Sequence, residues 1–177
     1  MSNDKEHNSS QETAKDKLVH GYEAMMDKLS AWSEKADETA GPILINGIKE
    51  AEDFLHDLKL WSKEEVDLIS QYLKRDLHDA AAQMEKENQE LKTWLGFDIQ
   101  QVEEKVLSLF ANMTDKTRLE LDKLDRMANE WHTGQVTSIG TLVCKKCAKE
   151  LHFHKPGRIP PCPGCGHTEF RRISDQD

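Results

Sequence analysis

Apolar residues between positions 14 and 134 recur at intervals of three and four, which places them on one stripe of an α-helix. Proline at position 42 separates the first stripe from the second, because proline suits the first turn of a new helix. The stripes are Leu18, Tyr22, Met25, Leu29 and Trp32; Leu44, Ile48, Ala51, Leu55 and Leu58; and Val66, Ile69, Leu73, Leu77, Ala80 and Met84. Such narrow stripes predict helices that pack against one another.

The third helix has a well-marked start. Ser62 and Glu65 have the spacing of a capping box, in which each side chain bonds the backbone N–H of the other residue. Trp61 and Val66 occupy the positions of the hydrophobic staple that flanks such a cap. The same arrangement recurs at Asp98, so a fourth helix is expected to begin there.

The third and fourth helices are expected to pair. They are predicted over 62–94 and 98–131, each roughly 50 Å long at the standard rise, with a short connection between them. The expected fold is therefore mostly α with a small β part: a long antiparallel helical hairpin or coiled-coil arm, followed by a C-terminal module. Whether the fourth helix breaks near Thr114 stays open, and Gly134 is expected to end it in either case.

All four cysteines lie in two CxxC pairs. Cys144 and Cys147 form the first pair, Cys162 and Cys165 the second, and fourteen residues separate them. This is the ligand spacing of a zinc ribbon, and four thiolates around Zn²⁺ leave no coordination position for a substrate. We therefore expect one structural Zn²⁺ ion, with iron in the same site as the less favoured alternative.

The sequence around the cysteines predicts strands. The β-branched segment 135–143 leads into the first pair, and 168–173 returns after the second. The predicted domains are a disordered tail over 1–13, a helical region over 14–134, a zinc ribbon over 135–173 and a tail over 174–177. If the ribbon is a separate module, replacing Cys165 with Ser releases the metal and unfolds the ribbon but leaves the helices intact.

Three histidines, His152, His154 and His167, lie near the cysteine pairs. With four cysteines available, we interpret them as surface groups or as hydrogen-bond partners of the thiolates, not as metal ligands.

Charge is distributed unevenly. Residues 1–134 carry 17 Lys and Arg against 29 Asp and Glu, whereas 135–177 carry 7 against 4. A nucleic-acid contact is therefore expected only in the C-terminal part, where cations surround Phe153 and Phe170 as in a base-stacking groove. The candidate phosphate contacts are Lys145, Lys146, Arg171 and Arg172. Both phenylalanines are equally explained as the apolar cover of the metal.

Several motifs along the chain also resemble those of a known family. They are Trp61-Ser-Lys-Glu-Glu-Val-Asp-Leu68, Lys74-Arg-Asp-Leu77, Thr114-Asp-Lys-Thr117, Gly140-Thr-Leu-Val-Cys-Lys-Lys-Cys147 and Cys162-Pro-Gly-Cys-Gly-His167. The chain resembles the YbeL-like family of bacterial zinc-ribbon proteins. The resemblance implies a helical N-terminal region and a C-terminal ribbon in a bacterial cytoplasm, with the metal ligands on the four cysteines. It implies no activity, because the family has no assigned reaction.

No nucleophile elbow, phosphate-binding loop, dinucleotide fingerprint or HExxH motif occurs, so we predict that the protein is not an enzyme. The leading hypothesis is a protein-protein interaction or adaptor module whose helical arm self-associates or binds a protein. The alternative is a nucleic-acid or ribosome-associated regulatory factor that binds through the basic ribbon. A third hypothesis is a redox sensor whose thiolates oxidise and release the metal.

The expected location is the cytoplasm. No segment approaches the roughly 20 apolar residues that a membrane span requires. The first residues lack the apolar stretch of a secretory signal, so the thiols are expected to stay reduced.

Overall fold

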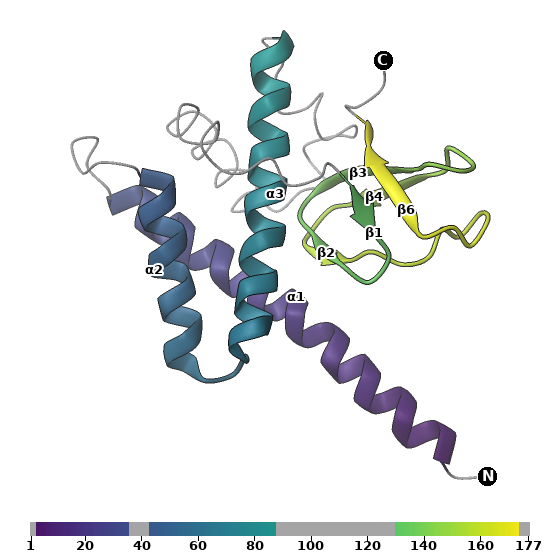
Figure 1. Ribbon diagram of the computed structural model, residues 1–177, viewed down its shortest axis with the longest axis horizontal. Coiled ribbons are helices and arrows are strands. Elements are labelled where there is room, and N and C mark those ends of the chain that lie inside the picture. Colours follow the sequence, from purple (N-terminus) through teal and green to yellow (C-terminus); the bar gives the residue numbers. More distant parts are fainter. Residues whose placement is uncertain (1–2, 36–42, 88–129, 174–177) are drawn as a thin grey trace.

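The structure is a computed structural model that describes residues 3–35, 43–87 and 130–173. Three helices come first and six short strands follow in these ranges (Figure 1). The helices are α1 (Asn3–Lys35), α2 (Ile43–Leu58) and α3 (Lys63–Glu87). The strands are β1 (Trp131–His132), β2 (Val136–Thr137), β3 (Gly140–Cys144), β4 (Glu150–Phe153), β5 (Gly157–Arg158) and β6 (Glu169–Arg172).

The three helices pack on one another, with α1 crossing α2 and α3 (Figure 1). Most members of the predicted apolar stripes whose side chains the structure describes face the common core, which confirms the helical periodicity. Its buried members are Tyr22, Met25 and Leu29 of α1, Ile48, Ala51 and Leu55 of α2, and Val66, Ile69, Leu73, Leu77 and Ala80 of α3. Leu58 is an exception, because it is the last residue of α2 and is 42% exposed.

The start of α3 has the predicted capping box. The backbone N–H of Glu65 donates to Ser62 Oγ (3.2 Å), and the N–H of Ser62 donates to Glu65 Oε2 (2.8 Å). Trp61 adds a second anchor, because its indole N–H donates to the backbone carbonyl of Lys17 on α1 (2.8 Å). The Lys17 ammonium donates to Glu65 Oε2 (2.7 Å). The cap therefore provides hydrogen-bond acceptors for N–H groups at the start of α3, and it also fixes this end of α3 to α1.

The ends of the helical region differ from the prediction or lie outside the described residues. Residues 3–13 belong to α1 in the structure, although the sequence predicts a disordered tail there. The prediction considered burial alone, whereas a helix already fixed by a buried stripe gains one hydrogen bond for each further residue. The predicted fourth helix and the Thr114 break fall on 88–129, outside the described residues. The long hairpin therefore remains a prediction, and the described helices show no long coiled-coil arm.

None of the helices described is both long and apolar enough to cross a membrane.

The strands form two small antiparallel sheets. One has the order β1-β6-β3-β4, and β2 pairs with β5 in the other. The predicted strand over 135–143 is divided into β2 and β3, with Gly140 at φ 127° after the break. Trp131 is also in a strand, where it pairs with Phe170. The ribbon therefore begins before the predicted boundary at 135, because Trp131 is part of its sheet and not the end of a helix.

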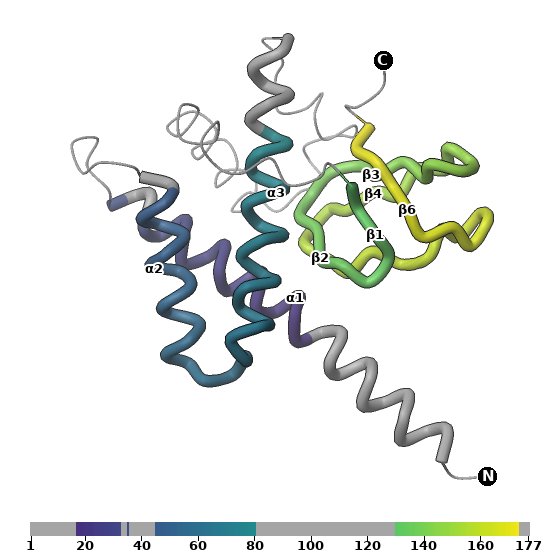
Figure 2. The backbone as a smooth tube through the Cα atoms, in the orientation of Figure 1, coloured from purple at the N-terminus to yellow at the C-terminus, as the bar shows by residue number. Residues whose placement is uncertain are grey.

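The ribbon packs directly against the helices. Val136 and Ile139 are fully buried in the same cluster as the helical stripes. The second cluster lies within the ribbon and holds Trp131, Leu142, Cys144, Leu151, Ile159, Cys162 and Phe170. Figure 2 shows the segment around β2 lying against α1 and α3. The helices and the ribbon thus share a core, whereas the sequence predicts an arm with a separate tip.

Candidate metal centre and its connection to the helices

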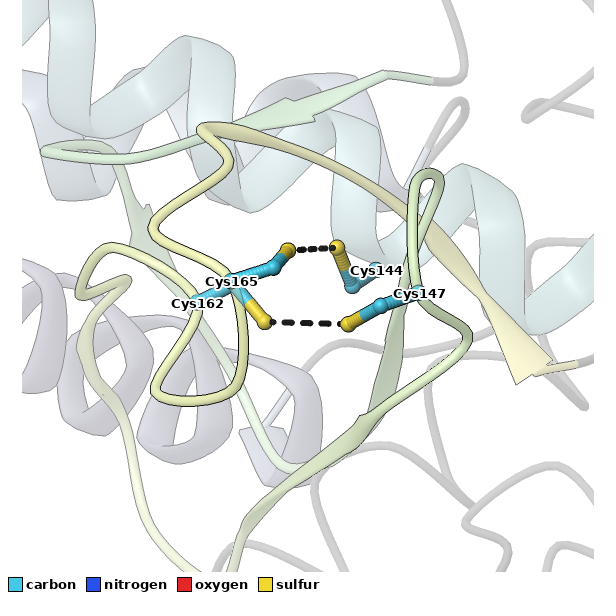
Figure 3. A group of neighbouring side chains, drawn as sticks. All are labelled: Cys144, Cys147, Cys162 and Cys165. Atoms are coloured by element: carbon cyan, nitrogen blue, oxygen red, sulfur yellow. Dashed lines mark hydrogen bonds between the residues drawn. The ribbon is translucent and has the colours of Figure 1, made fainter.

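The structure brings all four predicted metal ligands together. Cys144 ends β3 and Cys147 lies in the turn that follows, while Cys162 and Cys165 lie in the loop before β6. The four sulfur atoms lie within 4.8 Å of one another (Figure 3). The Sγ–Sγ distance is 3.6 Å both for Cys144 and Cys165 and for Cys147 and Cys162, much longer than a disulfide bond of about 2.05 Å.

The spacing of the four sulfurs fits a tetrahedral metal ion. Zinc–sulfur bonds of about 2.3 Å in a regular tetrahedron place neighbouring sulfurs about 3.8 Å apart. Two of the six sulfur–sulfur distances, at 3.6 Å, lie close to that value, and all six are within 4.8 Å. Cys144 and Cys162 are buried, and Cys147 and Cys165 are exposed, so an ion held here would lie at the edge of the ribbon. Four thiolates would fill its coordination shell and leave none of its positions for a substrate.

Both cysteine pairs lie in turns of the same construction. The N–H of Ala148 donates to the carbonyl of Cys144 (3.0 Å), and the N–H of Gly166 donates to the carbonyl of Cys162 (2.8 Å). In each turn, the backbone carbonyl of the residue that follows Ala148 or Gly166 accepts a hydrogen bond from the N–H of the first cysteine, at 2.9 Å. Ala148 and Gly166 have φ values of 58° and 71°. The sequence identifies the glycine of the second turn, but nothing in it marks Ala148.

The environment of the thiols differs across the cluster. Burial raises the pKa of the Cys162 thiol, but the backbone N–H groups of Gly164 and Cys165 and the neighbouring sulfurs lower it, to about 7. The backbone at Lys149 lowers the pKa of Cys147, whereas the Cys165 sulfur, burial and the other sulfurs raise it, to about 12. The proton on the Cys147 thiol is therefore held more firmly than the proton on Cys162. A cation bound there would displace it, since only thiolates act as ligands.

The aromatic residues near the site cover it. Phe170 is fully buried, pairs with Cys144 in the sheet and belongs to the same cluster as Cys144 and Cys162. Phe153 packs against that cluster and is partly buried. The interpretation of these side chains as a cover for the sulfurs agrees with this placement. Phe170 has no exposed surface on which a base could stack.

The four cations proposed to contact nucleic acid are in different environments. Lys145 is exposed and donates to Glu130 Oε1 (2.8 Å), and Lys146 is also exposed. Arg171 is half-buried, whereas Arg172 is fully buried. The assignment of Arg172 to a nucleic-acid surface is therefore wrong. Alternation along β6 explains it, because Arg172 shares the inward face with Phe170.

Arg172 reaches out of the ribbon into α3. Its Nε lies 3.3 Å from Asp79 Oδ2, and its Nη2 lies 3.5 Å from Asp76 Oδ1. The same guanidinium donates to the carbonyl of Ile139 (3.2 Å) and stacks over the Trp131 ring, with 5.1 Å to the centroid. A side chain at Gly140 would be strained by the φ of 127°, and its Cβ would force the Arg172 guanidinium to shift.

Asp76 is the centre of a buried network that joins the ribbon to the helices. Its carboxylate is fully buried and forms an ion pair with the adjacent Arg75 (3.0 Å). It also accepts hydrogen bonds from three parts of the fold. The donors are Tyr22 Oη of α1 (2.8 Å), Trp131 Nε1 of β1 (3.2 Å) and the Ser138 N–H between β2 and β3 (2.7 Å). Elements far apart in the sequence thus meet at one charge.

The network shifts two pKa values in opposite directions. Burial raises the pKa of Asp76, but the charges of Arg75 and Arg172 and the bonds from Ser138 and Tyr22 outweigh it and hold the pKa below its usual value. Burial and the Asp76 charge raise the pKa of Tyr22 well above the usual value for a phenol. Asp76 is therefore a carboxylate and Tyr22 a neutral donor at neutral pH.

The three histidines stay outside the sulfur cluster. His152 Nδ1 lies 2.9 Å from Thr141 Oγ1 on the neighbouring strand β3, and its Nε2 lies 3.7 Å from Glu150. Within the described residues the candidate metal-binding group contains cysteines alone.

Comparison with known proteins agrees with the sulfur geometry. A family model described as "Zinc-ribbon containing domain" matches residues 30–174. The chain belongs to this zinc-ribbon family. Uncharacterized protein YbeL of Escherichia coli strain K12 is 32% identical over 114 residues, which cover 63% of this chain and 70% of YbeL. YbeL of strains O6:H1 and O157:H7 matches to the same extent. The resemblance to the YbeL-like family is thereby confirmed. No solved structure matches the chain.

Proposed function

We propose that this protein is a non-enzymatic interaction module of the bacterial cytoplasm, in which a structural Zn²⁺ ion stabilises a ribbon that binds a protein partner together with the helices. The observation that carries the proposal is the burial of Phe170 and Arg172. These residues supply the stacking ring and a charge in the nucleic-acid hypothesis, and both belong to the interior. The surface of the ribbon therefore offers nucleic acid neither the Phe170 ring nor the Arg172 charge.

Zinc is preferred to iron in this proposal. The family description names zinc, whereas the spacing of the four sulfurs fits a closed tetrahedral shell around either ion. The test is metal analysis of protein purified from its own cells without added metal. We expect one zinc per chain, and stoichiometric iron with a thiolate-to-iron absorption band would contradict the assignment.

Self-association through the helices is also part of the proposal. Large apolar side chains remain at the surface of α2, the turn after it and α3, where Leu58, Leu60 and Leu68 are 42%, 60% and 38% exposed. Isolated exposed apolar residues are common, so these positions support docking only if they are covered in solution. Light scattering of Leu60→Ser against the unmodified protein would show whether the surface contributes.

The alternative function is a nucleic-acid or ribosome-associated factor, for which Lys145, Lys146 and Arg171 remain as candidate contacts. A single experiment distinguishes this alternative from the adaptor function. The full chain is captured from its own cells with and without nuclease, and co-purifying protein and nucleic acid are both measured. A stoichiometric protein partner that survives nuclease supports the adaptor function. Ribosomal material lost with nuclease, and with Lys146→Gln, supports the alternative.

A further inference from the structure

A cleft of about 680 Å³ separates α1 from the ribbon, and none of the four cysteines is among its lining residues. One wall is α1, and the opposite wall is the segment through β5 together with the turn between β1 and β2. The lining residues are Val19, His20, Glu23, Thr133, Gly134, Lys155, Pro156, Gly157, Arg158, Ile159, Pro160 and Pro161. The volume is typical of a ligand-binding pocket. Because both parts of the fold form it, the cleft depends on their packing.

Two cations line the cleft without forming an ion pair. Within the described residues, neither Lys155 nor Arg158 takes part in an ion pair. The Arg158 Nε atom is buried and lacks a hydrogen-bond partner there. The backbone of Arg158 is fixed by pairing with Val136, so its side chain starts from a defined position. An unpaired buried donor is costly, and a turn of the guanidinium towards an anion in the cleft would relieve that cost.

Much of the remaining lining is apolar and stiff, although His20, Glu23 and Thr133 also belong to it. Val19 and Ile159 contribute aliphatic surface, and Pro156, Pro160 and Pro161 add rings without a backbone N–H donor. A ligand that fills this cleft must therefore carry an apolar group next to its negative charge.

We propose that this cleft binds an extended acidic peptide segment of a protein partner. A Glu or Asp carboxylate of the peptide pairs with Arg158 and Lys155, and an adjacent aliphatic side chain packs on the prolines. This inference rests on the proposed function, since it names the partner's chemistry and the place where it docks. A planar guanidinium is well suited to hold a carboxylate through two parallel hydrogen bonds.

Nucleic acid fits this cleft less well. The lining contains no Phe, Tyr or Trp, and its one aromatic ring is the imidazole of His20, so a base finds little stacking surface there. Glu23 also lies in the wall, on the α1 side, where it would repel a continuous phosphate backbone. A peptide can avoid this, because its acidic and apolar side chains alternate and a single carboxylate can lie on the ribbon side.

The test uses the zinc-loaded full chain, labelled with ¹⁵N, and two synthetic hexapeptides. One alternates Glu with Leu, and the other replaces each Glu with Gln. The Glu peptide should cause saturable NMR shifts at the cleft amides, including Gly134 and Gly157, while the Gln peptide should bind at least about tenfold more weakly. Raising the salt concentration should weaken the binding of the Glu peptide, because salt screens the attraction between its carboxylates and the cations of the cleft.

Matched variants locate the binding. Lys155→Gln and Arg158→Gln should each weaken the Glu peptide several-fold, and Lys146→Gln, an exposed cation outside the cleft, should leave its affinity unchanged. Lys155 is itself exposed, so its substitution does not endanger the fold, and zinc content and helical circular dichroism verify each variant. Equal binding of both peptides, shifts outside the cleft, no saturable shifts, or displacement by an oligothymidylate at equal concentration would each overturn the proposal.

The adaptor function and the assignment of the cleft as its docking site can fail separately. If affinity capture from cells yields a protein partner that Arg158→Gln retains, the adaptor function stands and the cleft is not its docking site. If no variant, nor the unmodified chain, captures a protein, the adaptor function itself is refuted. Loss of the partner with both cleft variants, but not with Lys146→Gln, supports both.

Discussion

Asp76 and Arg172 are the residues on which the connection between helices and ribbon depends. A buried ion pair contributes little net stability over an apolar replacement, but removing one partner leaves the other charge unpaired inside the fold. Asp76 also accepts bonds from Tyr22, Trp131 and Ser138, so several donors lose their acceptor together.

We expect Asp76→Asn to lower the free energy of unfolding by about 3–5 kcal/mol, because it removes the counter-charge of Arg75 and Arg172. Urea unfolding followed by circular dichroism measures this. Asp67→Asn is the control, since Asp67 lies on the exposed face of the same helix, and its effect should stay within about 0.5 kcal/mol. Equal effects of the two substitutions would show that the network does not stabilise the protein.

Tyr22 gives a second prediction at this scale, on alkaline pH. Its raised pKa means that the folded state favours the neutral phenol. The resulting stability is complete below pH about 10, the pKa of an unfolded tyrosine, and is lost as the pH rises from there towards the pKa of the folded state. The ultraviolet absorbance of tyrosinate follows this titration, and Tyr22→Phe assigns it, because the chain has two tyrosines. Ionisation of Tyr22 at its ordinary pKa in folded protein would be inconsistent with the network.

Sequence reasoning reached the metal ligands but not this network. The four cysteines were identifiable because CxxC spacing reports a local geometry that the turn itself imposes. Arg172 and Asp76 lie in charged stretches that resemble ordinary surface, and only the packing of β6 against α3 buries them. The alternation of β6 offered a signal, since an inward Phe170 requires an inward residue two positions later.

Among the helices and strands too, the features that depend on neighbouring residues were predicted, and those that depend on distant contacts were missed. The capping box of α3 and the apolar stripes were predicted correctly because they depend on spacing within one helix. The start of the ribbon at Trp131 was missed because β1 has two residues and exists only by pairing with β6. The two cysteine turns share a construction that only the second reveals by its glycine.

Ala148→Gly should stabilise the protein by about 1 kcal/mol, because Ala148 holds a left-handed conformation (φ 58°) that a side chain disfavours. The residue is exposed, so the substitution removes no packing. Thermal unfolding of the metal-loaded protein measures the change. Ala31→Gly provides the opposite control, since Ala31 is exposed within α1 and the same change there should cost about 1 kcal/mol. A loss of stability at position 148 would argue against the common turn geometry.

At the scale of the whole molecule, the shared core changes what loss of the metal should do. A separate ribbon would unfold alone, as the sequence suggests for Cys165→Ser. In the structure the ribbon supplies Val136 and Ile139 to the helical core and Arg172 to Asp76. The state of the four sulfurs is therefore linked to the stability of helices that do not touch them.

Removal of the metal by a chelator, or Cys165→Ser, should lower the urea midpoint of the helical circular dichroism signal as well as unfold the ribbon. The expected loss is several kcal/mol, since a buried ion pair is broken and apolar surface is exposed. Restoring zinc to the chelated protein should recover the midpoint, whereas it should not do so for the variant. Identical helical transitions with and without the metal would mean that the two parts fold independently.

The position of Arg172 in the chain has a consequence for protein synthesis. Asp76 leaves the ribosome long before Arg172 is made, so a nascent chain has all three described helices before it has the last donor that neutralises their buried carboxylate. Until β6 is translated, that carboxylate has Arg75 and Tyr22 as partners but lacks Arg172. The buried network is therefore complete only when the final strand of the ribbon joins the helices.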